Sequence, residues 1–374
     1  MNHLFTPVRI KNITVKNRIA VPPMVVFTWA DDTGRATQKH VEHYEAIAKG
    51  GAGLIIQEAT CVNKNGRLAD TQLGIWEDGQ MEGLKKITEA VHRHETPILV
   101  QIHHAGVVGF AEKVVCPGDY EYMVKGQLKK VHKLTIEELH AIQQDFVTAA
   151  RRASLAGYDG VELHACHSYL ISQFLNRGVN HRDDRYGQEP ELFALEIIRE
   201  IRRQTPPDFI IGIRLGGFEP ALEDGIAFAR IFEESGVDFL DVSYGFVQET
   251  TPVVPKDYPF KDIIYAAQKM KEAVSIPVFA VNGINNPELA DKILEQTNVD
   301  MVDIGRGTLV NYNWANDAKE GRDVGTCLYC KTCMWRVDPM KCPGKQKHQR
   351  NHPSMNAFYE NNMKSPLSGK VVKN

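Results

Sequence analysis

The sequence predicts an α/β protein: a closed (β/α)8 TIM barrel followed by an irregular, cysteine-rich C-terminal extension. Three observations support this fold. Eight short apolar runs recur along the chain, and each is followed by a segment with helical periodicity. The first run lacks the G-x-G-x-x-G turn that a doubly wound open sheet, the competing fold, usually carries. The length of 374 residues suits one such barrel with an extension.

The expected strands share a content of apolar and β-branched residues. They cover residues 17–24, 53–60, 97–104, 160–165, 210–216, 239–245, 277–283 and 301–307. Helices are expected at residues 39–50, 78–94, 135–156, 190–204, 222–235, 261–273, 287–296 and 308–320. In the second helix Leu84, Ile87 and Val91 share one face, and Thr135 with Glu138 forms a capping box that opens the third.

Two connections, residues 105–134 and 166–189, are longer than simple linkers. Both follow strand C-termini, which form the face where barrel enzymes build their active sites. We therefore expect residues 1–320 to form the catalytic barrel. Residues 321–374 are rich in Lys, Asn, Pro and Cys with little apolar periodicity, so we expect an extension without a core of its own.

Composition excludes several classes of protein. A net charge of −3 gives no basic excess for nucleic acid or an anionic membrane. No apolar run approaches the ~20 residues of a membrane helix, and the N-terminus lacks the apolar core of a signal peptide. Seven cysteines, an odd number, favour thiols or metal ligands over a disulfide framework. We expect a cytoplasmic protein.

Polar side chains gather at the expected strand ends. Gln101 lies in the third strand, His164 and His167 at the end of the fourth, and Arg214 in the fifth. Burying such groups in one barrel mouth is costly unless each has a partner. A polar ligand with several acceptors is the simplest explanation.

Glycines mark the ends of the last two strands. Gly283 follows the seventh strand, and Gly305 and Arg306 follow the eighth. Many barrels bind phosphate there, since glycines let backbone N–H groups approach the oxygens and an arginine can bind them with two donors. Tight turns with a surface arginine explain the same residues equally well.

The motif His164-x-x-His167 with Tyr169 admits three interpretations. The histidines could be half of a metal site, or two structural histidines on a turn. They could also bind an anion, since two N–H donors at one point suit a developing oxyanion such as an enolate. Tyr169 could then supply a proton.

At this point the chain resembles a known family. The stretches that carry the resemblance occur in order across residues 4–310: LFTPVRIKNITVKNRI, PPMVVFT, GAGLIIQEAT, LGIWEDGQMEGLKKI, VQIHHAG, GYDGVELHACHSYLISQFLN, NHRDDRYG, IGIRLGGFE, DVSYG and IGRG. They resemble the Old Yellow Enzyme family of FMN-dependent ene-reductases, in particular its shorter bacterial branch. The family fold is a TIM barrel, in agreement with the strand count.

The resemblance implies that FMN binds at the barrel mouth. It places one group of residues beside the isoalloxazine, one at its pyrimidine edge and one at the phosphate. These are Pro23, Met24 and Val25 along the ring; Ala59 and Gln101 in contact with the ring, Gln101 at the pyrimidine edge; Arg214 near N1–C2=O; and Gly283, Gly305 and Arg306 at the phosphate.

The same resemblance implies the reaction. Hydride would pass from NAD(P)H through the flavin to the activated C=C bond of an α,β-unsaturated carbonyl compound. His164 and His167 would hold the carbonyl oxygen, and Tyr169 would protonate the α-carbon. Members are often homo-oligomers, which we expect here too. Val25 stands where Cys or Thr is frequent, and Phe27 and Val107 replace a tyrosine and an arginine. These departures affect the expected substrate range rather than flavin binding.

Cys327, Cys330, Cys333 and Cys342 form C-x2-C-x2-C-x8-C-P. This spacing resembles ferredoxin ligands and is close to the four-iron site of the larger, dienoyl-CoA reductase branch of the family. A 4Fe-4S cluster, zinc and unligated thiols all stay open. With a cluster, the protein would be a reductase subunit fed by an external electron donor. A flavin carrier with an unused substrate pocket is the remaining alternative.

Overall fold

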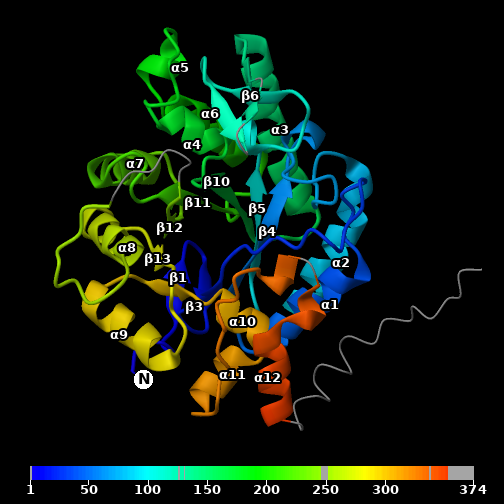
Figure 1. Ribbon diagram of the computed structural model, residues 1–374, viewed down its shortest axis with the longest axis vertical. Coiled ribbons are helices and arrows are strands. Elements are labelled where there is room, and N and C mark those ends of the chain that lie inside the picture. The colour runs from blue at the N-terminus through cyan, green and yellow to red at the C-terminus, as the bar shows by residue number, and fades with distance from the viewer. Residues whose placement is uncertain (1, 125–126, 130, 246–251, 337, 353–374) are drawn as a thin grey trace, which may run out of the picture.

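The predicted barrel is confirmed. The computed structural model describes residues 2–124, 127–129, 131–245, 252–336 and 338–352. Within them, eight parallel strands close in the order β10-β11-β12-β13-β14-β3-β4-β5 (Figure 1). Their bounds are β3 (Ile19–Val21), β4 (Leu54–Cys61), β5 (Ile98–His103), β10 (Gly160–Ala165), β11 (Ile210–Gly216), β12 (Phe239–Ser243), β13 (Val278–Ala280) and β14 (Met301–Asp303).

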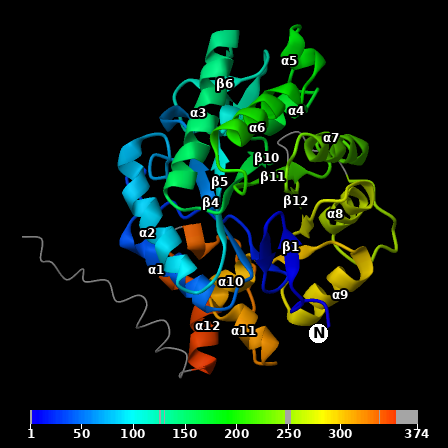
Figure 2. The same ribbon diagram turned by 180° about the vertical axis from the view of Figure 1, so that it is seen from behind.

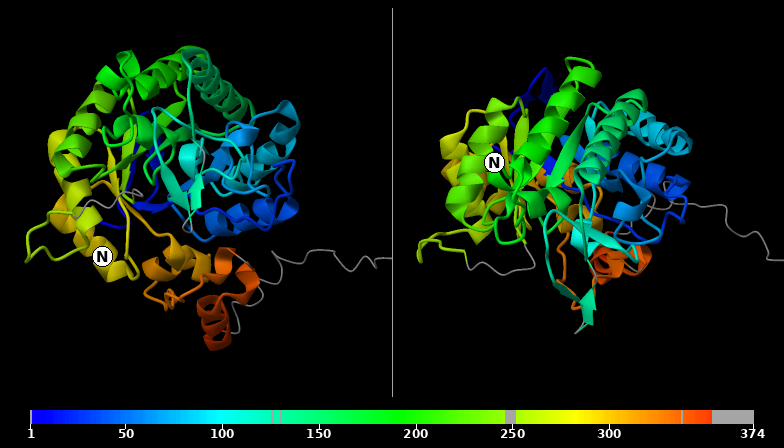
Figure 3. Two further views of the ribbon diagram at one scale, coloured as in Figure 1. Left: turned by 45° about the horizontal axis from the view of Figure 1, so that its top comes forward. Right: turned by 90° about the horizontal axis from the view of Figure 1, so that it is seen from above.

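The helices form an outer layer around the strands, as the view along the barrel shows (Figure 3). Thr135 opens α3 with the expected capping box, because its hydroxyl accepts from the Glu138 N–H and Glu138 accepts from the Thr135 N–H. The covering helices are α1 (Gln38–Lys49), α2 (Met81–His92), α3 (Ile136–Leu155), α6 (Leu192–Gln204), α7 (Leu222–Glu234), α8 (Asp262–Ala273), α9 (Pro287–Thr297), α10 (Arg306–Val310) and α11 (Trp314–Lys319).

A small hairpin closes the N-terminal end of the barrel. It consists of β1 (Val8–Ile10) and β2 (Ile13–Val15), which pair antiparallel (Figure 2). Its apolar side chains pack with barrel residues such as Phe239 and Phe279, whose rings stack with centroids 4.6 Å apart. The opposite, C-terminal end is therefore the end left for a site.

The two long connections carry elements of their own. Residues 105–134 contain two small strand pairs, and residues 166–189 contain two short helices. Their bounds are β6 (Val114–Cys116) with β9 (Val131–Lys133), β7 (Tyr122–Val124) with β8 (Gln127–Lys129), α4 (Leu170–Leu175) and α5 (Arg185–Gln188). Both connections leave the C-terminal ends of their strands, as expected.

The prediction of a single helix over residues 308–320 is wrong, because the chain forms two helices there, α10 and α11. The break falls at Asn311, whose side-chain oxygen accepts from the Asn313 N–H and whose amide donates to Asp317. Asparagine side chains compete in this way with the backbone bonds of a helix, and the apolar periodicity does not reveal it.

The described part of the extension packs against the barrel. Trp335 lies in an apolar cluster with Val26, Trp29 and Leu309, and its ring meets Trp29 at 5.5 Å. Helix α12 (Pro343–Asn351) follows and lies against α10 (Figure 1). Residues 353–374 of the predicted extension lie outside the described residues. Among the helices described, none is long and apolar enough to cross a membrane.

Candidate active site

Two adjoining cavities open at the C-terminal end of the barrel, with volumes of about 860 Å³ and about 320 Å³. They share Pro23, Met24, His167, Arg214 and Arg306 in their walls. The larger cavity is also lined by Val25, Ala59, Gln101, His164 and Tyr169, and the smaller one by Gly283 and Gly305. Every residue that we predicted for cofactor and substrate therefore lines one or both of these cavities.

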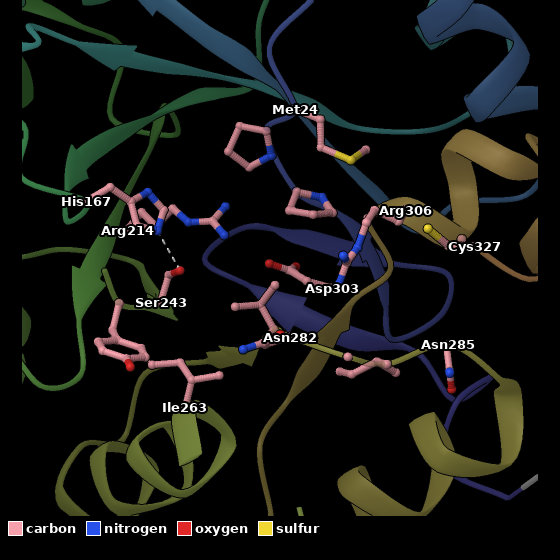
Figure 4. Close-up of a pocket in the computed structure, with 18 of the residues that line it drawn as sticks. Met24, His167, Arg214, Ser243, Ile263, Asn282, Asn285, Asp303, Arg306 and Cys327 are labelled. Atoms are coloured by element: carbon pink, nitrogen blue, oxygen red, sulfur yellow. Dashed lines mark hydrogen bonds between the residues drawn. The ribbon is translucent and has the colours of Figure 1, made fainter. Parts of the chain in front are cut away.

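The histidine pair is linked to β12. His167 Nδ1 lies 3.3 Å from His164 Nε2, and His167 Nε2 lies 2.8 Å from the Ser243 hydroxyl oxygen (Figure 4). This makes a hydrogen-bonded chain from β10 to the end of β12. Burial lowers the pKa of His167 to about 3 and that of His164 well below its ordinary value. Both rings are therefore neutral near pH 7, and each has one N–H to donate.

An unusual backbone conformation presents His167 to the cavity. His167 and Ser168 have φ angles of 56° and 62°, a region that non-glycine residues rarely adopt. Glu219 supports this turn, because its Oε1 accepts from the backbone N–H of His167 at 3.4 Å and of Gly245 at 3.1 Å. Burial raises the pKa of Glu219 to about 8. Strain of this kind is typical of functional sites.

Tyr169 lies against the first histidine. Its ring stacks on that of His164 with centroids 4.0 Å apart and planes at 28°, and it lies 5.2 Å from the His103 ring. Burial raises the pKa of the Tyr169 hydroxyl. The phenol therefore keeps its proton at neutral pH and is available as an acid.

Arg214 is a buried cation between the two cavities. Its Nη1 lies 2.9 Å from Asp241 Oδ2, while its Nε has no hydrogen-bond partner in the part of the chain described. Burial disfavours its charge, but the carboxyl groups of Asp241, Glu162 and Asp303 outweigh this, and the pKa of Arg214 is raised. A buried guanidinium with an unused donor fits a ligand that carries an acceptor.

Three buried carboxyl groups surround this cation. Glu162 accepts a hydrogen bond from the Gln101 amide at 2.7 Å, which fixes the orientation of Gln101 at the larger cavity. Burial and the neighbouring carboxyl groups raise the pKa of Glu162 and Asp303 well above their ordinary values. Asp303 lines the smaller cavity.

The smaller cavity has the features of a phosphate site. Gly283 has a φ of 74°, and a Cβ on Gly305 would lie only 3.3 Å from Met24 Sδ and Pro22 Cγ. Arg306 lies beside the cavity (Figure 4). Its guanidinium carbon is 4.4 Å from the centre of the Tyr329 ring. These residues fit FMN: a phosphate in the small cavity, and a ring along Pro23–Val25 with Arg214 and Gln101 at its edge.

The part of the chain that carries Cys327, Cys330, Cys333 and Cys342, called here the cysteine segment, covers the mouth of the two cavities. Cys327 lines the smaller cavity, and Cys330 and Cys333 line the larger one with Arg336. All four cysteines of the segment are free thiols. Among the described residues, no three of these sulfurs lie within 4.8 Å of one another. Four zinc thiolates at about 2.3 Å would lie about 3.8 Å apart, so this arrangement does not fit a single zinc ion.

The sequence interpretation missed the positioning residues. Ser243 and Glu219 were not assigned roles, although they hold His167. The carboxyl groups around Arg214 were missed as well. The sequence does contain a signal for them, since Glu162, Asp241 and Asp303 are each the only acidic residue of a buried barrel strand.

A barrel mouth of this shape fits a flat anionic cofactor with a second molecule beside it, as in flavin-dependent oxidoreductases. A family model described as the NADH:flavin oxidoreductase / NADH oxidase family matches residues 3–324. The chain belongs to this family, of which the Old Yellow Enzymes are members. The predicted family resemblance is therefore confirmed, whereas a metal in the extension stays a prediction.

Two curated relatives illustrate the match. An NADH oxidase of Thermoanaerobacter brockii is 38% identical over 346 residues, which cover 88% of this chain and 52% of that protein. The chain thus spans about half the length of this relative. An NADPH dehydrogenase of Bacillus subtilis (strain 168) is 35% identical over 313 residues, covering 82% of this chain and 91% of that protein.

Solved structures show the same fold. A 2-naphthoyl-CoA reductase in complex with 2-naphthoyl-CoA aligns with a TM-score of 0.82 at 24% identity, over 91% of this chain and 56% of that one. An Old Yellow Enzyme homologue from Zymomonas mobilis aligns with a TM-score of 0.74 at 24% identity, over 90% of this chain and 99% of that one.

Proposed function

We propose that this protein reduces the activated C=C bond of an α,β-unsaturated carbonyl compound at the expense of NAD(P)H. The observation that carries the proposal is that His164, His167 and Tyr169 line the larger cavity together with residues that fit FMN. FMN, when bound, accepts hydride from NAD(P)H and donates it to the β-carbon.

The histidines bind the carbonyl oxygen in this proposal. Both are neutral, and the 3.3 Å contact between them occupies one nitrogen of each ring. A substrate oxygen that enters between the rings would replace this contact, and it would accept a hydrogen bond from each ring in the tautomer that carries the proton on the nitrogen facing the oxygen. Negative charge grows on that oxygen as hydride arrives, so the donors stabilise the transition state more than the ground state.

Tyr169 supplies the proton to the α-carbon. Its hydroxyl is protonated at neutral pH, because the ordinary pKa of tyrosine is near 10 and burial raises the pKa of Tyr169 further. Its stacking on His164 fixes the ring beside the bound carbonyl. Arg214 contributes a permanent positive charge near the cofactor edge, which favours an anionic form of the ring system there.

A second candidate function rests on the cysteine segment. Cys330 and Cys333 line the same cavity as His164 and Tyr169, so an iron–sulfur cluster there would lie beside the flavin site. In that case the protein would be a reductase subunit supplied by an external electron donor. The cluster stays a prediction, and no step above depends on it.

Location and assembly are also proposals. The seven cysteines are all free thiols, which supports a reducing compartment such as the cytoplasm. A homo-oligomer stays a prediction from the family resemblance.

Anaerobic stopped-flow measurement of the two half-reactions tests the proposed function. Protein loaded with FMN should lose its flavin absorbance on mixing with NAD(P)H and regain it on mixing with 2-cyclohexenone. If NAD(P)H bleaches the flavin and enones never restore it, the protein is a flavin carrier or an oxidase rather than an enone reductase.

A further inference from the structure

A group of potential metal ligands lies outside the flavin site, at the base of the cysteine segment. Asp323 follows α11, His348 lies on α12, and His352 is the C-cap residue directly after α12. One ligand atom from each of the three residues lies within 4.8 Å of the others. The two histidines are four residues apart, the spacing that places two imidazoles on one face of a helix for a shared metal.

The carboxylate is oriented toward the histidines. Asp323 Oδ1 accepts from the backbone N–H of Gly325 at 2.9 Å. Its Oδ2 lies 2.9 Å from His352 Nε2 and 3.7 Å from His348 Nδ1. Ligand atoms at about 2.0–2.2 Å from a tetrahedral zinc ion lie about 3.3–3.6 Å from one another. The observed separations lie on either side of that range, so small side-chain shifts suffice to admit the ion.

A second observation points to a ligand. His348 is 3% exposed, and neither of its ring nitrogens has a hydrogen-bond partner within the described residues. A buried imidazole without a hydrogen bond is costly, and a metal ion at Nδ1 would satisfy it. A Cβ on Gly325 would lie 3.0 Å from this nitrogen, so glycine leaves the room that the ring needs.

We propose that Asp323, His348 and His352 bind a zinc ion, with water as the fourth ligand. Imidazole and carboxylate oxygen are common zinc ligands, and three protein ligands with one water form a frequent arrangement. The ion would join the chain just before Cys327 to the helix just after Cys342. It would close the cysteine segment at its base and hold it over the flavin cavities. The site is separate from the four thiols and does not depend on the proposed reduction.

Calorimetric titration of the full chain with Zn²⁺ tests this site. We expect one binding event that survives in a Cys330→Ser/Cys333→Ser chain and weakens at least about tenfold in His352→Ala, because one of the three ligands is lost. Asp323→Asn, an isosteric change, should weaken it as well. His92→Ala is the matched control, since His92 pairs with Asp159 at 2.9 Å outside the proposed site, and this variant should bind zinc as the parent does.

Two further measurements separate this site from the alternatives. Co²⁺ in the proposed site should give no thiolate-to-metal charge-transfer band, and Zn²⁺ should slow proteolysis between residues 323 and 348 in the parent but not in His352→Ala. Unchanged zinc affinity in both His352→Ala and Asp323→Asn would overturn the proposal. Binding that is lost with the cysteine substitutions would overturn it too, and would assign the metal to the thiols.

Discussion

Replacing Tyr169 by phenylalanine removes the proposed acid and little else. The ring stacks on His164 with centroids 4.0 Å apart and lies 5.2 Å from His103, and phenylalanine keeps both contacts. Among the described residues, no hydrogen bond of the hydroxyl is found, so the change breaks none there. We therefore expect Tyr169→Phe to fold and to bind FMN as the parent does.

The rate of flavin reoxidation by an enone should fall strongly in Tyr169→Phe. A positioned general acid contributes about 10²–10⁴ in rate, which corresponds to about 2.7–5.4 kcal/mol of activation free energy. A tyrosine ordinarily titrates near 10 and burial raises the pKa of Tyr169 further, so the parent phenol is fully protonated near pH 7 and the whole effect should be visible there.

Anaerobic stopped-flow measurement isolates the step. FMN-loaded protein is reduced with one equivalent of NAD(P)H and mixed with 2-cyclohexenone, and return of the flavin absorbance gives the rate. Tyr169→Phe should slow this reoxidation by the stated factor while reduction by NAD(P)H stays near the parent rate. Tyr244→Phe is the control, since Tyr244 lines the smaller cavity and packs on Phe218. If Tyr169→Phe reoxidises at the parent rate, solvent or another group supplies the proton.

Three further predictions follow from the same site. Arg306→Ala removes a charge-assisted phosphate contact of about 1.5–3 kcal/mol, so FMN affinity measured by fluorescence titration should fall about ten- to a hundredfold; an unchanged affinity would place the phosphate elsewhere. Ser243→Ala removes the 2.8 Å contact that positions His167. Flavin reoxidation by the enone should therefore slow by about fivefold, the equivalent of a ~1 kcal/mol hydrogen bond, while flavin reduction by NAD(P)H is much less affected. Equal losses in both half-reactions would show a general disruption. Burial raises the pKa of Glu219 from 4.5 to about 8, so between these pH values the folded chain holds a proton on Glu219 that the unfolded chain releases. The free energy of unfolding that this protonation contributes is lost as pH rises from 4.5 through about 8. Glu219→Gln should therefore flatten the fall in melting temperature over that range, and the same dependence of melting temperature on pH in parent and variant would contradict the assignment.

The sequence predicts those parts of the site that depend on strand ends. Gln101, His164 and Arg214 lie within apolar runs, and the parallel barrel brings the ends of such runs to one mouth. The role of Tyr169 could be predicted because it follows the histidine pair closely in the sequence. For these residues, knowing the order of strands is enough to know that they meet.

Contacts that depend on side-chain orientation were not predictable in the same way. The hydrogen bond between His167 and Ser243 and the support from Glu219 join residues 76 and 52 positions apart. Their existence depends on the positive φ at His167, which periodicity does not encode. The break at Asn311 and the packing of Trp335 on Trp29 likewise arise from individual side chains rather than from an apolar pattern.

Anaerobic turnover with quantified products tests the central claim most directly. FMN-loaded protein is supplied with NAD(P)H and 2-cyclohexenone in the absence of oxygen, and both NAD(P)H consumed and saturated ketone formed are measured. The proposed function predicts one molecule of cyclohexanone for each NAD(P)H oxidised. It is contradicted if NAD(P)H is oxidised only when oxygen is admitted and no saturated ketone forms.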